Sequence, residues 1–289
     1  MLSPLPFAAT LTLHAPHLTK PGEGFLGWLT NSILVSIIVS AFVIWFCRAA
    51  TRQMSLVPHP LQNAFEAIIE GLYDILESIV GRHMIARTFP LLATLFIFIL
   101  ASNWFSLLPG VGSIGFGQRE GGFFNVPHME TPLLRPTTAD LNMTAAMALI
   151  LMAFWLYWAL AELGAKGLFL HTFGVKGGLK GLVAFALAPI FFFVGVIEVI
   201  SIIFRPISLS LRLYGNIFAG ENLLTAMITL GHDLNLPDWL AAIASITVPI
   251  PFYFLELLVG LLQAFVFMLL SAVYIQLVTT HDESEGAGH

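Results

Sequence analysis

Charged residues are scarce in this sequence. Only 10% of the 289 residues are charged, whereas 57% are hydrophobic, and the mean hydropathy is +0.88. A soluble domain usually carries about 25% charged residues, so this chain lacks the polar groups needed to cover a water-facing surface. The composition therefore predicts an all-α integral membrane protein that crosses the bilayer several times.

Cysteine clusters and basic blocks are also missing. Cys47 is the only cysteine, which excludes an internal disulfide framework or thiolate metal site. No dense run of Lys and Arg indicates nucleic-acid binding. The nine histidines fall in predicted loops, termini or span edges, and neither an HExxH motif nor a phosphate-binding loop is present. We therefore expect no metal, no cofactor and no catalytic site, which leaves an intramembrane enzyme poorly supported.

Long apolar segments are what the sequence has instead. Because a spanning helix needs about 20 mostly apolar residues, we expect about five membrane helices plus one surface helix. Along the chain we predict an N-terminal outside segment at 1–24, a transmembrane helix at 25–48, an amphipathic helix at 60–81, a transmembrane hairpin with a long outside loop at 89–165, a long helical hairpin at 178–280 and an acidic cytoplasmic tail at 281–289.

The segment 60–81 differs from the other apolar segments. Its apolar residues recur at helical spacing, but acidic residues interrupt them at Glu66, Glu70, Asp74 and Glu77. This pattern predicts an amphipathic helix that lies on the membrane surface or against a partner.

Two apolar tracts near the C-terminus, 182–230 and 237–278, are unusually long. At about 1.5 Å per residue, each exceeds the hydrocarbon core of roughly 30 Å if it is straight and upright. Each tract is therefore either two spans or one long tilted helix. Because no charged turn divides the first tract near its middle, we favour two long tilted helices that form a hairpin.

The basic residues predict the orientation of the chain. Most of them fall between the first two predicted spans or just after the third, at Arg48, Arg52, Arg82, Arg87, Lys166, Lys176 and Lys180. Cytoplasmic loops carry an excess of Lys and Arg. We therefore expect the N-terminus to lie outside and the C-terminus in the cytoplasm.

Several charged and amide residues lie inside the two long tracts. They are Glu198, Arg205, Arg212, Asn216, Glu221, Asn222, Glu256, Gln263 and Gln276. Because a charge at the bilayer centre costs about 2.5–3.5 kcal/mol on insertion scales, such residues are functional candidates. Arg205 lies just before a proline, where a headgroup contact or pairing with Glu198 accounts for it, and Gln276 is close to a membrane edge. Arg212 has no acidic residue three or four positions away, so it is the strongest candidate.

Helical spacing groups these candidates. Glu198 and Arg212 are fourteen positions apart and share a face, whereas Glu221, nine positions further, points to another face. Glu256 and Gln263 are seven apart and share a face of the last helix. The titratable residues therefore fall into separate groups on different helix faces, with one permanently charged arginine among them. Such an arrangement suits two separate proton entries with a barrier between them.

Four motifs carry a resemblance to a known family. They are RPISLSLRLYGNIFAGE at 205–221, LLQAFVFMLLSAVYI at 261–275, TADLNMT at 138–144 and SNWFSLLPG at 102–110. In these motifs, and over nearly its whole length, the chain resembles subunit a of the F-type ATP synthase, the Fo membrane stator. The resemblance implies a non-catalytic, proton-translocating subunit in a bacterial plasma membrane, with the c-ring rotor, the peripheral-stalk b subunits and the rest of the synthase as partners. H⁺ rather than Na⁺ is the expected ion.

The resemblance also implies residue roles. Arg212 matches the essential arginine that faces the c-ring carboxylate. Asn216, Glu221, Glu256 and Gln263 match the outer half-channel and its junction with the arginine. Glu198 and Ser208 match the cytoplasmic half-channel, and Asp140 and Asn142 match outer-side support. Many relatives have histidine at one of the positions that Glu221 and Glu256 occupy, so here a carboxylate pair takes its place. The remaining alternative is a secondary ion or proton antiporter, although the internal repeats common in such transporters are not visible.

Overall fold

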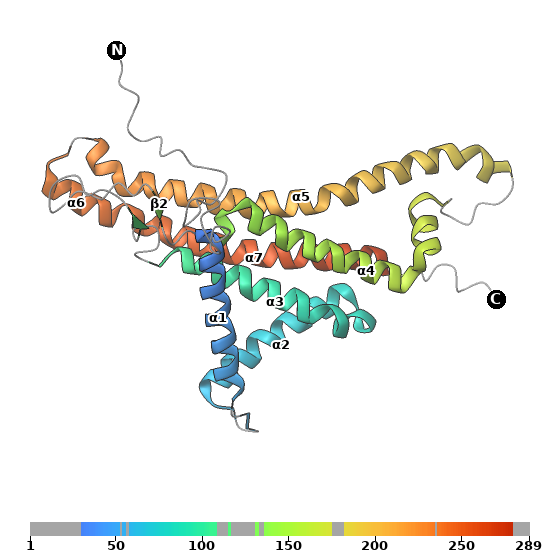
Figure 1. The fold of residues 1–289 in the computed structure, drawn as a ribbon, viewed down its shortest axis with the longest axis horizontal. Coiled ribbons are helices and arrows are strands. Elements are labelled where there is room, and N and C mark those ends of the chain that lie inside the picture. Colours follow the sequence, from blue (N-terminus) through green and yellow to red (C-terminus); the bar gives the residue numbers. More distant parts are fainter. Residues whose placement is uncertain are drawn as a thin grey trace, which may run out of the picture. The chain divides into compact units, whose positions relative to one another are not determined.

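The fold is taken from a computed structural model of the chain (Figure 1). It describes residues 30–52, 54–55, 58–108, 115–116, 131–132, 136–174, 182–234 and 236–279. The predicted outside segment 1–24, the acidic tail 281–289 and most of the long loop 109–135 lie outside the described residues. Lys176 and Lys180, which contribute to the predicted orientation, also lie outside them.

The described elements are almost all helical. In chain order they are α1 (Asn31–Thr51), α2 (Pro60–Val80), α3 (Arg82–Ser106), β1 (Gly115–Phe116), β2 (Thr131–Pro132), a 3₁₀ turn η1 (Thr137–Ala139), α4 (Leu141–Phe173), α5 (Leu182–Asp233), α6 (Asp238–Thr247) and α7 (Pro249–Thr279). The two short strands pair antiparallel, with Gly115 opposite Pro132.

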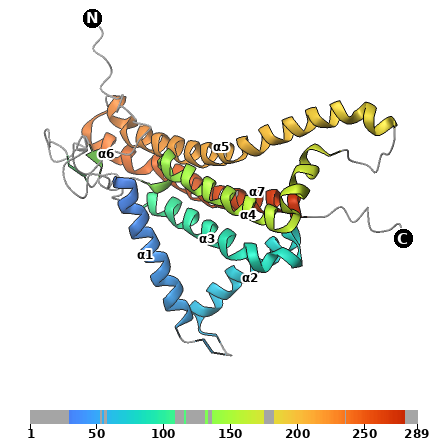
Figure 2. The ribbon, with the colours of Figure 1, turned by 45° about the vertical axis from the view of Figure 1, so that its right-hand side comes forward.

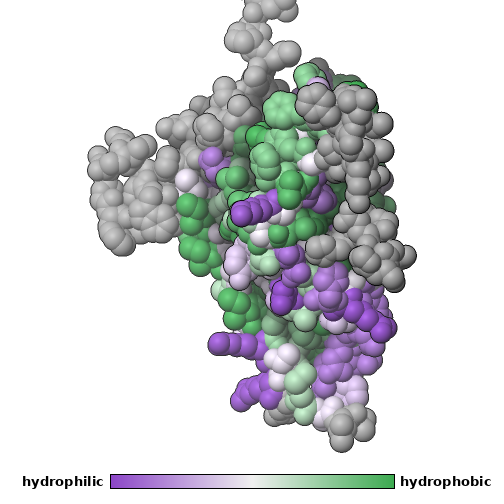
Figure 3. Space-filling model, turned by 90° about the vertical axis from the view of Figure 1, so that its right-hand side faces the viewer, coloured by the Kyte–Doolittle hydropathy of each residue, from purple (hydrophilic) through white to green (hydrophobic). Residues whose placement is uncertain are grey.

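Five helical stretches of the described chain are long and apolar enough to cross a membrane. They are Asn31–Thr51, Arg82–Ser106, Leu141–Phe173, Pro189–Gly231 and Asp238–Thr279. Large apolar side chains are exposed along them, among them Phe42 and Trp45 on α1 and Phe193 on α5. Figure 3 shows hydrophobic residues over much of the face that it draws, with hydrophilic residues most frequent in the lower half of the view. The predicted all-α membrane fold with about five spans is confirmed.

The chain forms two compact units, each assembled from three stretches of sequence. The first contains Met1–Phe46, Phe98–Thr144 and Leu213–Gln263, and the second contains Cys47–Ile97, Ala145–Arg212 and Ala264–His289. Helices α1, α3, α4, α5 and α7 each contribute residues to both units.

In the first unit, the C-terminal part of α5 turns back through α6 into α7. The backbone of Gly231 packs so closely that a Cβ there would lie 2.8 Å from the Cα of Ala241. The amide of Leu236 donates to the Gly231 carbonyl across the same turn. Figures 1 and 2 both show this part of α5 alongside α6 and the start of α7. Side chains of α5 and α7 are thereby brought within reach of one another.

In the second unit, α2 is amphipathic. Leu72, Leu76 and Val80 are buried on one face, whereas Glu70 and Asp74 are exposed. The helix ends at Gly81, whose φ of 83° is a conformation that favours glycine. Because α3 begins at the very next residue, this glycine sets the sharp junction between the two helices.

Two breaks interrupt the long helices. Gly164 has φ 68° and ψ 166°, which divides α4 into two helical segments, 141–163 and 165–173. In Figure 1 the last turns of α4 run in a new direction. The second long tract divides at Val248 into α6 and α7. The first tract is the single helix α5, which contains both Pro189 and Pro206.

Candidate functional site

Arg212 lies on an exposed face of α5. Leu209 and Ser210 are buried on the packed side of this helix, whereas Ser208, Leu211 and Arg212 are exposed. The exposed side also carries large apolar side chains, Ile203, Phe204, Ile207 and Leu211. Arg212 forms no hydrogen bond or ion pair with any described residue. It is therefore a fixed positive charge on a mostly apolar helix face, without a counter-charge among the described residues.

Arg205 occupies a different environment, one heptad before Arg212. Its guanidinium lies 5.6 Å from the ring centroid of Trp155 on α4 and 4.7 Å from that of Tyr274 on α7. The indole of Trp155 donates to the backbone carbonyl of Tyr274 at 2.8 Å, which ties the Trp155 ring to α7 at this position. Cation–π contacts of this kind contribute about 0.5–2 kcal/mol each. From the sequence we expect Arg205 either to contact lipid headgroups or to pair with Glu198. No sequence feature indicated its contacts with the rings of Trp155 and Tyr274.

Glu198 lies on α5, seven residues before Arg205. It is partly buried, and its Oε1 is 3.9 Å from Nδ1 of His171 at the end of α4. Sequence reasoning placed His171 among the loop and edge histidines and gave it no role. The two residues are 27 positions apart, so helical periodicity held no signal that they meet.

Two amides of the predicted outer group meet in the first unit. Asn216 on α5 donates from Nδ2 to Oε1 of Gln263 on α7, at 2.7 Å. Gln263 is buried, whereas Asn216 is on the exposed side of its helix. The two residues are 47 positions apart in the chain. This hydrogen bond joins the helix that carries Arg212 to the helix that carries Glu256.

Glu256 is buried against a glycine. Its side chain is 6% exposed and occupies the place where a Cβ at Gly220 would be, so any larger residue at 220 would overlap the carboxylate. Gly220 directly precedes Glu221, which is partly buried. Glu221 therefore lies one residue along α5 from the position that Glu256 contacts.

Asp140 and Asn142 lie at the start of α4. Asp140 is 2% exposed, and its Oδ1 accepts the backbone N–H of Asn142 at 3.0 Å. A carboxylate that satisfies free amides at a helix start is a standard N-cap. The structure thus gives these two residues a local capping contact.

A buried amide, Asn103, links three elements of the first unit. Its Nδ2 donates to the Gly260 carbonyl on α7 at 3.0 Å, and its Oδ1 accepts from Thr138 Oγ1 on η1 at 2.9 Å. The neighbouring Trp104 donates to the Leu257 carbonyl. Two of the quoted motifs, at 102–110 and 138–144, therefore meet at α7 near Glu256. Sequence reasoning noted both motifs but gave Asn103 no role.

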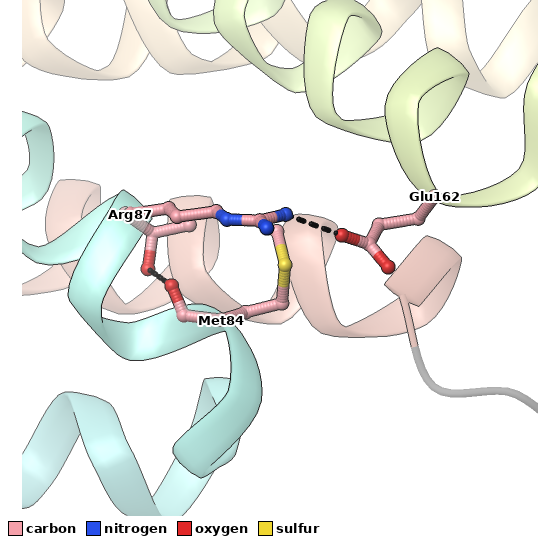
Figure 4. Close-up of polar contacts among 4 residues, drawn as sticks. Met84, Arg87 and Glu162 are labelled. Carbon is pink, nitrogen blue, oxygen red and sulfur yellow. Dashed lines mark hydrogen bonds and ion pairs between the residues drawn. The ribbon is translucent and has the colours of Figure 1, made fainter.

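An ion pair links α3 to α4 in the second unit. The guanidinium of Arg87 reaches across to Glu162, with Nη1 2.7 Å from Oε1 (Figure 4). One residue on, Thr88 donates to the Met84 carbonyl within α3. Arg87 is well exposed, so the pair is screened by water and contributes at most about 1 kcal/mol. Among the described residues no group of three His, Cys, Asp or Glu is placed to hold a metal ion.

Together these features define a multi-spanning helical membrane protein with charged and amide side chains inside its spans. Residues 33–276 match the family described as "ATP synthase A chain". The chain belongs to this family, and it is accordingly an Fo stator subunit of the F-type ATP synthase.

Curated relatives agree with the family match. The chain is 32% identical to "ATP synthase subunit a" of Trichlorobacter lovleyi over 277 residues, which cover 96% of this chain and 97% of the relative. It is 33% identical to "ATP synthase subunit a" of Geobacter sulfurreducens over 260 residues, 90% and 89% of the two chains. It is 35% identical to "ATP synthase subunit a" of Citrifermentans bemidjiense over 253 residues, 88% and 89%. The resemblance stated from the sequence is confirmed.

Proposed function

We propose that this chain provides the proton path of the Fo motor, with two offset half-channels and Arg212 between them. The observation that carries the proposal is the arginine on the exposed apolar face of α5, without a partner among the described residues. An isolated charge at membrane depth is costly unless a counter-charge meets it. A carboxylate on each passing helix of the c-ring is the counter-charge that we propose.

The outer half-channel is assigned to the α5–α7 contact of the first unit. Glu221 and Glu256 exchange the proton, and the hydrogen-bonded pair Asn216 and Gln263 leads it toward the arginine. The burial of Glu256 and Gln263 supports a path in which water or side-chain rotation carries the proton at each step. The N-cap formed by Asp140 and Asn142 supports this end of the path structurally.

The cytoplasmic half-channel is assigned to the second unit. Ser208 lies one helical turn before Arg212 on the same exposed side of α5, and Glu198 lies further along the helix toward the predicted cytoplasmic end. A proton released by the rotor carboxylate passes Ser208 and reaches Glu198. Arg205 stays fixed between two aromatic rings and does not carry the proton, because arginine remains protonated in proteins.

The arginine then has two tasks. It attracts a deprotonated rotor carboxylate, and it blocks a direct leak between the half-channels because it cannot itself relay protons. A proton from the outer half-channel neutralises the carboxylate, which is then free to enter lipid without a bare charge. The membrane potential supplies about 2.3 kcal/mol per charge per 100 mV. ATP chemistry takes place in other subunits, so this chain needs neither a catalytic site nor a resident cofactor.

The remaining assignments follow from the same proposal. The partners are the c-ring, the peripheral-stalk b subunits, the rest of the synthase and the lipid bilayer. The exposed acidic side of α2 faces the membrane surface or a stalk subunit. The location is a bacterial plasma membrane, with the N-terminus outside and the C-terminus in the cytoplasm.

Replacement of Arg212 tests the proposal directly. We expect Arg212→Ala to abolish ATP-driven proton pumping in inverted membrane vesicles, and Arg212→Lys to lose most of it because an ammonium lacks the planar fork. Arg87→Ala is the matched control, since among the described residues that exposed arginine pairs with Glu162 on the surface of the second unit. Near-normal pumping by an assembled Arg212→Ala complex would overturn the assignment and favour a self-contained transporter.

A further inference from the structure

The end of α4 brings a histidine to Glu198. His171 lies in the last turn of the helix, and its Nδ1 is 3.9 Å from Glu198 Oε1. The side chains are 32% and 26% exposed, so both are partly shielded by the rest of the chain. A histidine beside a carboxylate in this setting is suited to proton exchange, because histidine changes charge between pH 5 and 8.

Close backbone packing holds the two helices together at this point. Gly195 lies one turn before Glu198 on α5, and a Cβ there would be 2.7 Å from the Thr172 carbonyl oxygen. The rings of Phe173 and Phe192 are 5.6 Å apart on the same contact. Because glycine allows this approach, His171 and Glu198 face one another from adjacent, closely packed positions.

We infer that His171 is a proton-transfer partner of Glu198 at the mouth of the cytoplasmic half-channel. This inference deepens the proposed function and rests on it. During ATP synthesis, a protonated Glu198 gives its proton to neutral His171, which leaves a carboxylate and an imidazolium. The imidazolium then releases the proton to cytoplasmic water, which restores neutral His171, and the Glu198 carboxylate is protonated again by the next proton from the rotor side. During ATP-driven pumping the same steps run in reverse.

The distance and the electrostatics fit this role. A separation of 3.9 Å is longer than a direct hydrogen bond but suits transfer through one bridging water. The C-terminal end of a helix favours a positive charge, so the α4 terminus supports the imidazolium. Other charged or titratable groups here are Arg205 on α5, which interacts electrostatically with Glu198, and Tyr274 on α7, which contacts Arg205.

The test measures the pH dependence of pumping in the whole ATP synthase. In inverted vesicles the cytoplasmic mouth faces the medium, so its pH is varied from about 6 to 9. We expect His171→Gln to lower ATP-driven pumping about three- to tenfold per assembled complex. This loss is smaller than the loss expected when a general acid or base is removed from an enzyme, because water can also transfer the proton here. The fall of the wild-type rate with rising pH should also flatten, because a glutamine does not titrate.

Two further variants separate proton transfer from structural damage. His83→Gln is the matched control, because His83 is an exposed histidine at the start of α3 in the same unit. Its pH profile should remain that of the wild type. In His171→Ala, imidazole added to the medium should restore a large share of the lost pumping. In a Glu198→Gln background, His171→Gln should cause little further loss.

The outcomes distinguish this inference from the proposed function. If His171→Gln and His171→Asn both keep the wild-type pH profile, the inference is overturned although the proposed function stands. The same holds if imidazole does not improve pumping by assembled His171→Ala complexes. If Arg212→Ala pumps normally, the proposed function itself fails, whatever the His171 variants do.

Discussion

At the scale of single residues, the most constrained position of the candidate site is a glycine. Gly220 leaves room for the buried carboxylate of Glu256, and no other residue fits without moving it. Gly215, on the same helix, has open space around its missing Cβ. A close contact therefore requires glycine at position 220 but not at position 215, and alanine substitution at each position should distinguish the two.

We expect Gly220→Ala to displace Glu256 and to lower proton pumping at least about tenfold, because misplaced groups transfer protons poorly. Glu256→Asp shortens the side chain by one methylene, so the double variant Gly220→Ala/Glu256→Asp should recover part of the pumping. Gly215→Ala should retain more pumping than Gly220→Ala, because the added Cβ meets no described atom, and it should favour the helix by up to about 1 kcal/mol. Equal behaviour of the two alanine variants in pumping assays would contradict the close contact.

Asn103 leads to a prediction about stability. Replacing it with Leu removes the hydrogen bonds to Gly260 and Thr138 and leaves buried polar groups unpaired. We expect the assembled complex to lose about 1–3 kcal/mol of stability, measured as a lower thermal midpoint in detergent. Asn103→Asp keeps the acceptor for Thr138 but places a buried carboxylate oxygen against the Gly260 carbonyl, so the loss should be at least as large. An unchanged midpoint in Asn103→Leu would show that this network contributes nothing.

At the scale of elements, the sequence predicts helices better than it predicts contacts. Hydropathy is a local property, so the spans and the amphipathic α2 follow from composition and periodicity alone. The break at Gly164 depends on a positive φ, which one glycine among 24 in the chain does not indicate by itself. The division at Val248 does have a sequence signal, because Pro249 and Pro251 follow it directly and lack the N–H that a continuous helix needs.

Helix α5 has two sides that cross-linking should distinguish. In a Cys47→Ser background, single cysteines at Ser208 and Leu211 lie on the exposed side, and one at Leu209 lies on the buried side. We expect oxidation to link the exposed-side cysteines to cysteines on the outer helix of the c-ring, and to give no product from position 209. Products from all three positions, or from 209 alone, would contradict the proposed rotor-facing side.

At the scale of the whole molecule, the candidate site was only partly predictable. Arg212 was identified because a charge within an apolar tract is conspicuous in sequence. The residues that contact the site were not, because the pairs Asn216–Gln263, Arg205–Tyr274 and His171–Glu198 are separated by tens of residues. A single sequence does not show which distant positions are in contact. Packing between helices decides them, and so they became visible only in the structure.

The predicted orientation is a property of the whole chain and can be tested with two positions. His59, between α1 and α2, and Asp238, at the start of α6, are both exposed. In the Cys47→Ser background, a membrane-impermeant maleimide should label His59→Cys only in inverted vesicles and Asp238→Cys only in right-side-out vesicles. The reason is that basic residues favour the cytoplasm, and His59 lies in the segment between Arg48 and Arg82. If each position is labelled from the side opposite to the one expected, the assignments of the outer and cytoplasmic half-channels must be exchanged. If both positions are labelled from the same side, the predicted number of membrane crossings between them is wrong.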